Sequence, residues 1–203
     1  MSSNKYFIGQ KLGMTQIIDE TGVVLPVTVI KAYDTSVVGF RTIEKDGYSS
    51  LVVGYNECEK SDISKPKAGQ FSKKFFKNIK EFRTDDLDGY VLDQPLDIDS
   101  FELGKSFHIR SRTIGRGFTG AIKAWNHQRG PETHGSKNHR LLGSIGQATT
   151  PGRVMKGKKM HTRYGNEYVT LKNLKLVKRD GSLLFFKGAV PGKSNKVFGC
   201  LGG

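Results

Sequence analysis

The part of the chain that most limits the possible folds is residues 126–163, which contain no Phe, Tyr or Trp. Their large apolar side chains are only Leu141, Leu142, Ile145, Val154, Met155 and Met160. Such a segment cannot bury enough apolar surface to offset the entropy cost of ordering its backbone. Long structureless segments are uncommon in compact domains unless they are functional. We therefore predict that this segment has no fold of its own and is ordered by a partner.

The same region carries most of the positive charge. The 203 residues have a net charge of +14 and a pI of about 9.8. Between Lys105 and Tyr168 there are thirteen Lys and Arg against two Glu, together with all five His and ten of the 25 Gly. Glycine lets a backbone approach closely, and Arg and Lys neutralise phosphate charge. This composition predicts a long basic loop that lies against nucleic acid.

Other classes of protein fit the sequence less well. No apolar run approaches the roughly 18 to 20 residues that a membrane span needs, so no membrane partner is expected. The N-terminal residues show no charged start followed by an apolar core, so we expect no secretory signal. Cys58 and Cys200 are far apart and form no CxxC pair. We therefore expect neither a disulfide framework nor a cysteine zinc site, and a reducing compartment fits.

The flanks of the basic region have the pattern of short β-strands. Three pairs of strand-like segments are each joined by a short turn sequence that contains glycine: 6–18 with 23–32, 35–43 with 48–55, and 168–178 with 182–187. Pro26 restricts part of its strand to an edge or a bulge. Regularly spaced short strands predict a mainly β fold, a small β-barrel interrupted by the long irregular basic loop, with one or two short helices.

The best helix candidate is residues 68–79, where Phe71, Phe75 and Ile79 recur at intervals of four. We interpret its lysines as a solvated face, with an RNA contact as the alternative. The predicted organisation is then residues 1–104 as the first part of the barrel domain, 105–168 as the basic loop, and 169–203 as the closing strands and tail.

Two nucleotide-binding patterns occur by chance. Residues 115–120 match GxGxxG, but a dinucleotide site needs a βαβ unit and an acidic residue about 20 positions later. This chain has Arg140 in that neighbourhood. A phosphate loop ending at Ser194 would need its first glycine at Lys187, so that pattern fails.

The histidines raise the alternative of a metal site or a nuclease. His134 and His139 are five residues apart, and Glu132 is the only acidic residue nearby. No HExxH motif or paired-carboxylate cation site can be built from them, so we expect no metal and no cofactor. Neighbouring glycines make this a poor place for two positioned imidazoles. Neutral histidines that hydrogen-bond to RNA are the preferred interpretation, and we expect no enzyme activity.

Several long motifs follow one another in the order typical of one family. They are 8–17 (IGQKLGMTQI), 115–125 (GRGFTGAIKAW), 133–136 (THGS), 139–140 (HR), 143–147 (GSIGQ), 150–160 (TPGRVMKGKKM) and 187–192 (KGAVPG). Together they resemble the bacterial-type "L-three" family of large-subunit ribosomal proteins over essentially the whole chain. Archaeal and eukaryotic members are much longer, so the resemblance is to the bacterial or organellar form.

The resemblance implies a β-barrel at the subunit surface and an extension that runs through large-subunit RNA toward the peptidyl-transferase centre. The tip of that extension would be at Gln147, Ala148, Thr149 and Thr150. The family is associated with early subunit assembly. Some bacterial relatives carry a methylated glutamine at the position of Thr149, so that modification is not expected here.

The expected partners are large-subunit ribosomal RNA and neighbouring large-subunit proteins, on a cytoplasmic or organellar ribosome, with no small-molecule substrate. Trp125 has two interpretations, a core anchor at the loop base or a stacking surface for RNA bases. The candidate RNA-binding residues are Arg110, Arg112, Arg116, Lys123, Trp125, Arg129, His134, Lys137, His139, Arg140, Arg153, Lys156, Lys158, Lys159 and Arg163. A histidine-dependent ribonuclease and a general polyanion-binding module remain as alternative functions.

Overall fold

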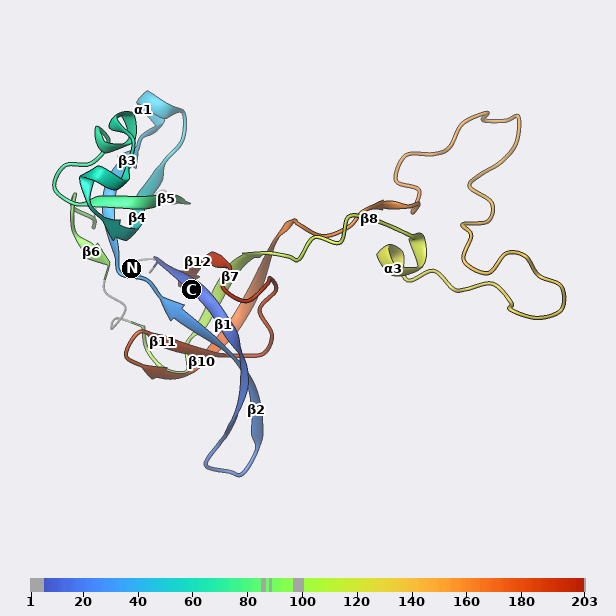
Figure 1. The fold of residues 1–203 in the computed structure, drawn as a ribbon, viewed down its shortest axis with the longest axis horizontal. Helices are drawn as coiled ribbons and strands as arrows, with labels where there is room; N and C mark the ends of the chain where they lie inside the picture. The colour runs from blue at the N-terminus through green and yellow to red at the C-terminus, as the bar shows by residue number, and fades with distance from the viewer. Residues whose placement is uncertain (1–5, 85–86, 88, 97–100, 203) are drawn as a thin grey trace. The chain divides into compact units, whose positions relative to one another are not determined.

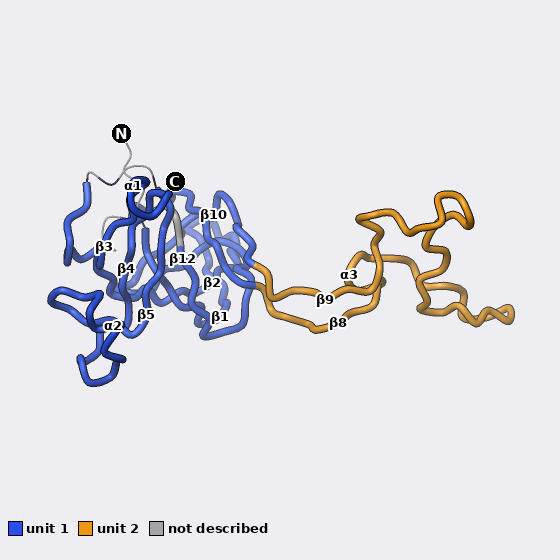
Figure 2. The backbone as a smooth tube through the Cα atoms, turned by 90° about the horizontal axis from the view of Figure 1, so that it is seen from above, with its two compact units in different colours: residues 1–112, 168–203 blue, residues 113–167 orange. Residues whose placement is uncertain are grey.

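The chain divides into two units, which Figure 2 colours separately. Unit 1 is residues 1–112 with 168–203, and unit 2 is residues 113–167. The computed structural model describes residues 6–84, 87, 89–96 and 101–202. Figure 1 draws unit 1 with nearly all of the strands, as expected for a mainly β protein, and unit 2 mostly as irregular chain.

Six strands of unit 1 pair in a closed order. The order is β1 (Tyr6–Ile18), β12 (Val197–Gly202), β7 (Ser106–Arg112), β10 (Tyr168–Asp180), β11 (Leu183–Lys187) and β2 (Val24–Ala32), and β2 pairs again with β1. All six pairings are antiparallel. Each strand therefore has a hydrogen-bonded neighbour on both sides, which leaves its backbone groups satisfied.

The three predicted strand pairs are confirmed. The β1–β2 hairpin turns at Asp19, whose N–H donates to Val23 O at 2.9 Å. Pro26 pairs with β1 but lies just outside the residues of β2 that pair with β11. Its missing N–H therefore costs no hydrogen bond between strands, as predicted for an edge position. The β10–β11 pair forms as expected.

The other predicted pair belongs to a second, four-stranded sheet. Its order is β5 (Phe75–Arg83), β4 (Ser50–Cys58), β3 (Thr35–Arg41) and β6 (Pro95–Leu96). The connection between β3 and β4 contains the short helix α1 (Ile43–Asp46) rather than only a tight turn. The 3-10 helix η1 (Lys60–Asp62) and helix α2 (Lys65–Ala68) lie between β4 and β5.

The described residues of unit 1 form two cores, and β1 contributes to both because successive side chains of a strand point to opposite faces. Phe7 belongs to the first core, where its ring lies 6.2 Å from that of Phe186. Tyr6 and Ile8 belong to the second core, where Tyr6 lies 5.0 Å from Phe82 of β5. The start of β1 thus connects the ring of six strands to the second sheet.

Two expectations from the sequence are wrong. Residues 68–79 do not form a helix, because α2 ends at Ala68 and β5 begins at Phe75. Antiparallel pairing with β4 satisfies this backbone, and Phe76 and Phe82 are buried on one strand face. The basic loop also does not begin at Lys105, because β7 occupies most of the stretch up to Arg112.

Among the described residues, no helix is long and apolar enough to span a membrane.

Candidate nucleic-acid interface

Unit 2 begins and ends as a two-stranded stem. Thr113 N–H donates to Glu167 O and Arg116 N–H to Tyr164 O, both at 2.9 Å. Strands β8 (Phe118–Thr119) and β9 (Thr162–Arg163) then pair antiparallel. Gly165 has φ +74°, and a Cβ there would lie 2.2 Å from Ile114 O, so the two chains of the stem can approach this closely only at glycine.

Helix α3 (Ala121–Trp125) follows the stem. Ala121 is buried, whereas Trp125 is 42% exposed. The indole Nε1 of Trp125 donates to Met160 O at 2.8 Å, and Lys159 Nζ lies 6.0 Å from the ring centroid. Trp125 is therefore not a core anchor. A hydrogen bond ties its edge to the returning chain and leaves part of the ring open to solvent.

The irregular chain beyond α3 is held by few contacts. Gly130 N–H donates to His139 O at 2.9 Å, and a Cβ on Gly130 would lie 1.8 Å from Asn138 O. His139 Nδ1 lies 3.0 Å from Pro131 O. Glycine at position 130 is thus required for two backbone segments to meet, which is a different use of glycine from approach to a phosphate.

Unit 2 has almost no interior. Of its residues, all of which the structure describes, only Thr119 and Ala121 are buried. Among the residues that the structure describes, both hydrophobic cores are built from unit 1. Packing therefore contributes little to the stability of unit 2 compared with the cost of ordering its backbone.

The cations of unit 2 are exposed and mostly unpaired. Arg129 forms an ion pair with Glu132. The other nine have no carboxylate partner among the described residues: Arg116, Lys123, Lys137, Arg140, Arg153, Lys156, Lys158, Lys159 and Arg163. A set of exposed charges of one sign, without internal partners, is suited to bind a polyanion.

The expected tip residues Gln147, Ala148, Thr149 and Thr150 lie in the irregular chain, and all four are exposed. His134 is also exposed and has φ +59°. No regular element contains any of them. Their side chains are therefore available to a partner.

Two of the predicted residues lie in unit 1. Arg110 and Arg112 are on β7, where alternate positions share one face, and their guanidinium carbons lie 5.1 and 5.8 Å from the ring centroid of Tyr168. Tyr168 pairs with Arg112 in the β7–β10 register. Sequence reasoning missed Tyr168 as a partner because that pairing joins distant parts of the chain. The alternation of Arg110 and Arg112 was the available signal.

Sequence reasoning also missed a second aromatic surface. Phe118 of β8 is 79% exposed and stacks with His161, with 6.2 Å between the ring centroids. An exposed aromatic pair among cations offers a surface on which bases can stack. The signal was the aromatic residue inside a glycine-rich motif, where little core exists to bury it.

The geometry does not support the catalytic alternatives. Residues 115–120 form one side of an antiparallel stem rather than the turn of a βαβ unit. Glu132, the acid nearest His134 and His139 in the sequence, is paired with Arg129. Among the described residues, no group of three or more His, Cys, Asp or Glu is placed to hold a metal ion.

Comparison with known proteins gives one consistent result. The sequence model of the family described as "Ribosomal protein L3" matches residues 90–182. The large ribosomal subunit protein uL3 of Picosynechococcus sp. is 45% identical over 94% of this chain and 92% of its own length. The uL3 of Fervidobacterium nodosum is 45% identical over 93% of each chain, and the uL3c of Guillardia theta is 42% identical over 94% of this chain and 96% of its own. The chain therefore belongs to the ribosomal protein L3 family.

Proposed function

We propose that this protein is a structural constituent of the large ribosomal subunit and binds large-subunit ribosomal RNA directly, without catalysing a reaction. The observation that carries the proposal is the set of nine exposed cations of unit 2 that lack a carboxylate partner among the described residues. Membership of the L3 family, whose relatives are named as large-subunit proteins, supports the same function.

The physical role is that of a brace. RNA helices repel one another through their phosphates, and cations of unit 2 placed between them would neutralise that charge and release counterions. Because unit 2 has little interior, folded RNA would supply the surface against which it becomes ordered. RNA would be read mainly through shape, backbone and hydroxyl contacts, so sequence discrimination would be modest.

The finer assignments are also proposals. In this scheme the closed order of six strands is the small β-barrel at the subunit surface, and unit 2 is the extension. Gln147, Ala148, Thr149 and Thr150 lie near the peptidyl-transferase centre, and the protein takes part in early subunit assembly. Its other contacts are with neighbouring large-subunit proteins, on a cytoplasmic or organellar ribosome.

Removal of the extension tests the proposal. Strands β8 and β9 pair with Thr119 opposite Thr162, so an Asn-Gly turn between these two residues would close the stem as a hairpin. The intact chain should co-sediment with large subunits at high salt, and the shortened chain should not. The shortened chain should keep the cooperative unfolding of unit 1, whose cores do not include unit 2. Equal retention of both chains on subunits at high salt would contradict the proposal.

The ribonuclease alternative makes a different prediction. Labelled RNA incubated with the purified protein should stay intact, and cleavage that is lost on His134→Ala would favour the enzyme instead. A general polyanion-binding module would bind duplex DNA and large-subunit RNA equally well. Competition between the two nucleic acids therefore separates that alternative from the ribosomal function.

A further inference from the structure

A pocket of about 300 Å³ in unit 1 is lined by residues of unit 1. Strand β5 contributes Lys80 and Arg83 to its lining, β7 contributes Arg110, and β12 contributes Gly199. Tyr48, which precedes β4, completes one side. Three cations from two distant strands thus line one cavity.

The packing of the two sheets explains the position of Lys80. Lys80 and Phe82 point to the same face of β5, and Phe82 is buried in the second core. A Cβ on Gly199 would lie 2.9 Å from both Lys80 Nζ and Phe82 Cε1, so the ammonium group lies against the backbone of β12. Gly199 is paired in register with Arg110, which places the two cations side by side.

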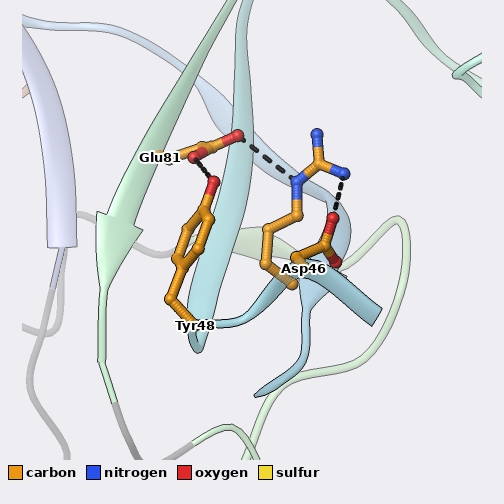
Figure 3. Close-up of polar contacts among 4 residues, drawn as sticks. Asp46, Tyr48 and Glu81 are labelled. Carbon is orange, nitrogen blue, oxygen red and sulfur yellow. Dashed lines mark hydrogen bonds and ion pairs between the residues drawn. The ribbon is translucent and has the colours of Figure 1, made fainter. Parts of the chain in front are cut away.

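The acidic residue of the pocket is already engaged. Figure 3 shows Tyr48 and Glu81 in contact, with Asp46 nearby. Glu81 Oε2 accepts a hydrogen bond from Tyr48 OH at 2.8 Å, and Glu81 Oε1 accepts one from Arg41 Nε at 3.4 Å. The bond to Glu81 raises the pKa of Tyr48, so the hydroxyl stays a donor at neutral pH.

The three cations have no such partner. Among the described residues, no carboxylate lies within ion-pair distance of Lys80, Arg83 or Arg110. Arg83 lies over the ring of Tyr48 at 5.2 Å, so an aromatic face rather than an acid holds its guanidinium group. Burial, and then the charge of Arg110, lower the pKa of Lys80 to about 8. Lys80 and Arg110 therefore place two neighbouring positive charges at the pocket, an arrangement that an anion would stabilise.

We propose that this pocket binds a backbone phosphate of RNA, with Lys80 and Arg110 as its direct ligands. An ammonium group acts as a point charge and a guanidinium group as a planar fork, and both bind phosphate oxygens through charge-assisted hydrogen bonds. The proposal rests on the proposed function in that the phosphate belongs to RNA. It adds a second contact region on unit 1, built by folding of the β-sheets rather than by a segment that lacks a core.

The test measures binding of large-subunit RNA by the full-length protein between pH 7 and pH 9. A bound phosphate should restore the pKa of Lys80 toward its ordinary value of 10.5, so RNA binding takes up a proton above pH 8. Wild-type affinity should then fall about tenfold from pH 7 to pH 9, because the free protein increasingly holds a neutral Lys80. Lys80→Met should remove this part of the pH dependence and weaken binding about tenfold at pH 7.

The control variant is Lys178→Met, which removes an exposed lysine of β10 and should leave the pH dependence unchanged. Lys80→Met should fold at least as stably as the wild type in urea, because it replaces a charge that is costly to bury. If Lys80→Met binds RNA more weakly than the wild type but is no less stable, a merely structural role of Lys80 does not explain the loss of binding.

Each remaining outcome is decisive. Equal pH dependence of wild type and Lys80→Met, with both still binding RNA, would overturn the phosphate site and leave the proposed function intact. Failure of both to bind RNA would overturn the proposed function as well. NMR titration can show whether inorganic phosphate raises the pKa of Lys80. If it does, but Lys80→Met leaves RNA affinity unchanged, the pocket binds free phosphate and the RNA assignment is rejected.

Discussion

Replacement of four cations in unit 2 should weaken the salt dependence of RNA binding and leave the free energy of unfolding nearly unchanged. The variant carries Gln at Arg153, Lys156, Lys158 and Lys159, four exposed positions within seven residues that have no carboxylate partner among the described residues. If about eight of the nine unpaired cations of unit 2 meet phosphates, log affinity against log salt should have a slope of about −6 to −7 in the wild type.

Each phosphate contact contributes roughly 0.7 to 0.9 to that slope, so loss of four contacts should reduce its magnitude by about 3. The variant should bind about 10³-fold more weakly than the wild type at 0.1 M salt, and the two affinities should converge near 1 M. The free energy of unfolding should change by no more than about 0.5 kcal/mol, because the four side chains are exposed and lie outside both cores.

Filter binding of labelled large-subunit RNA at several salt concentrations measures the slope. The matched control carries Gln at four exposed lysines of unit 1, Lys172, Lys175, Lys178 and Lys187, and removes the same charge. The control should keep most of the wild-type slope. An equal loss of slope in both variants would mean that total charge, and not the cations of unit 2, sets the affinity, and the reasoning would be refuted.

Three further predictions concern folding. Phe186→Ala should lower the free energy of unfolding by about 3 to 5 kcal/mol in urea, because this ring is fully buried in the first core, whereas Phe118→Ala at an exposed position should cost less than about 0.5 kcal/mol. Gly54→Ala should cost about 1 to 3 kcal/mol, because its Cβ would lie 2.4 Å from the ring of Phe76, and Gly39→Ala, with open space at its Cβ, should be near neutral by the same denaturation measurement. Without RNA, hydrogen exchange should be fast through unit 2 outside its stem and slow in the first core, and strong protection across both would contradict an extension that depends on RNA for order.

Features with a local cause could be predicted from the sequence. The turn at Asp19 and the strands on either side of it followed from alternation and turn chemistry within about 27 residues. The prediction of a helix at residues 68–79 also rested on a local pattern, and it was wrong. A period of four among three side chains carries no information about β4, the strand that pairs with this segment.

The sequence by itself determined where the charge lies and which part cannot build a core, because both follow from composition. It could not give the closed strand order, in which β1 meets β12 at the other end of the chain. Nor could it place Lys80 beside Arg110, since neither residue belongs to a motif with the other. Only the tertiary structure decided these, because long-range pairing depends on the sum of many weak contacts that local patterns do not contain.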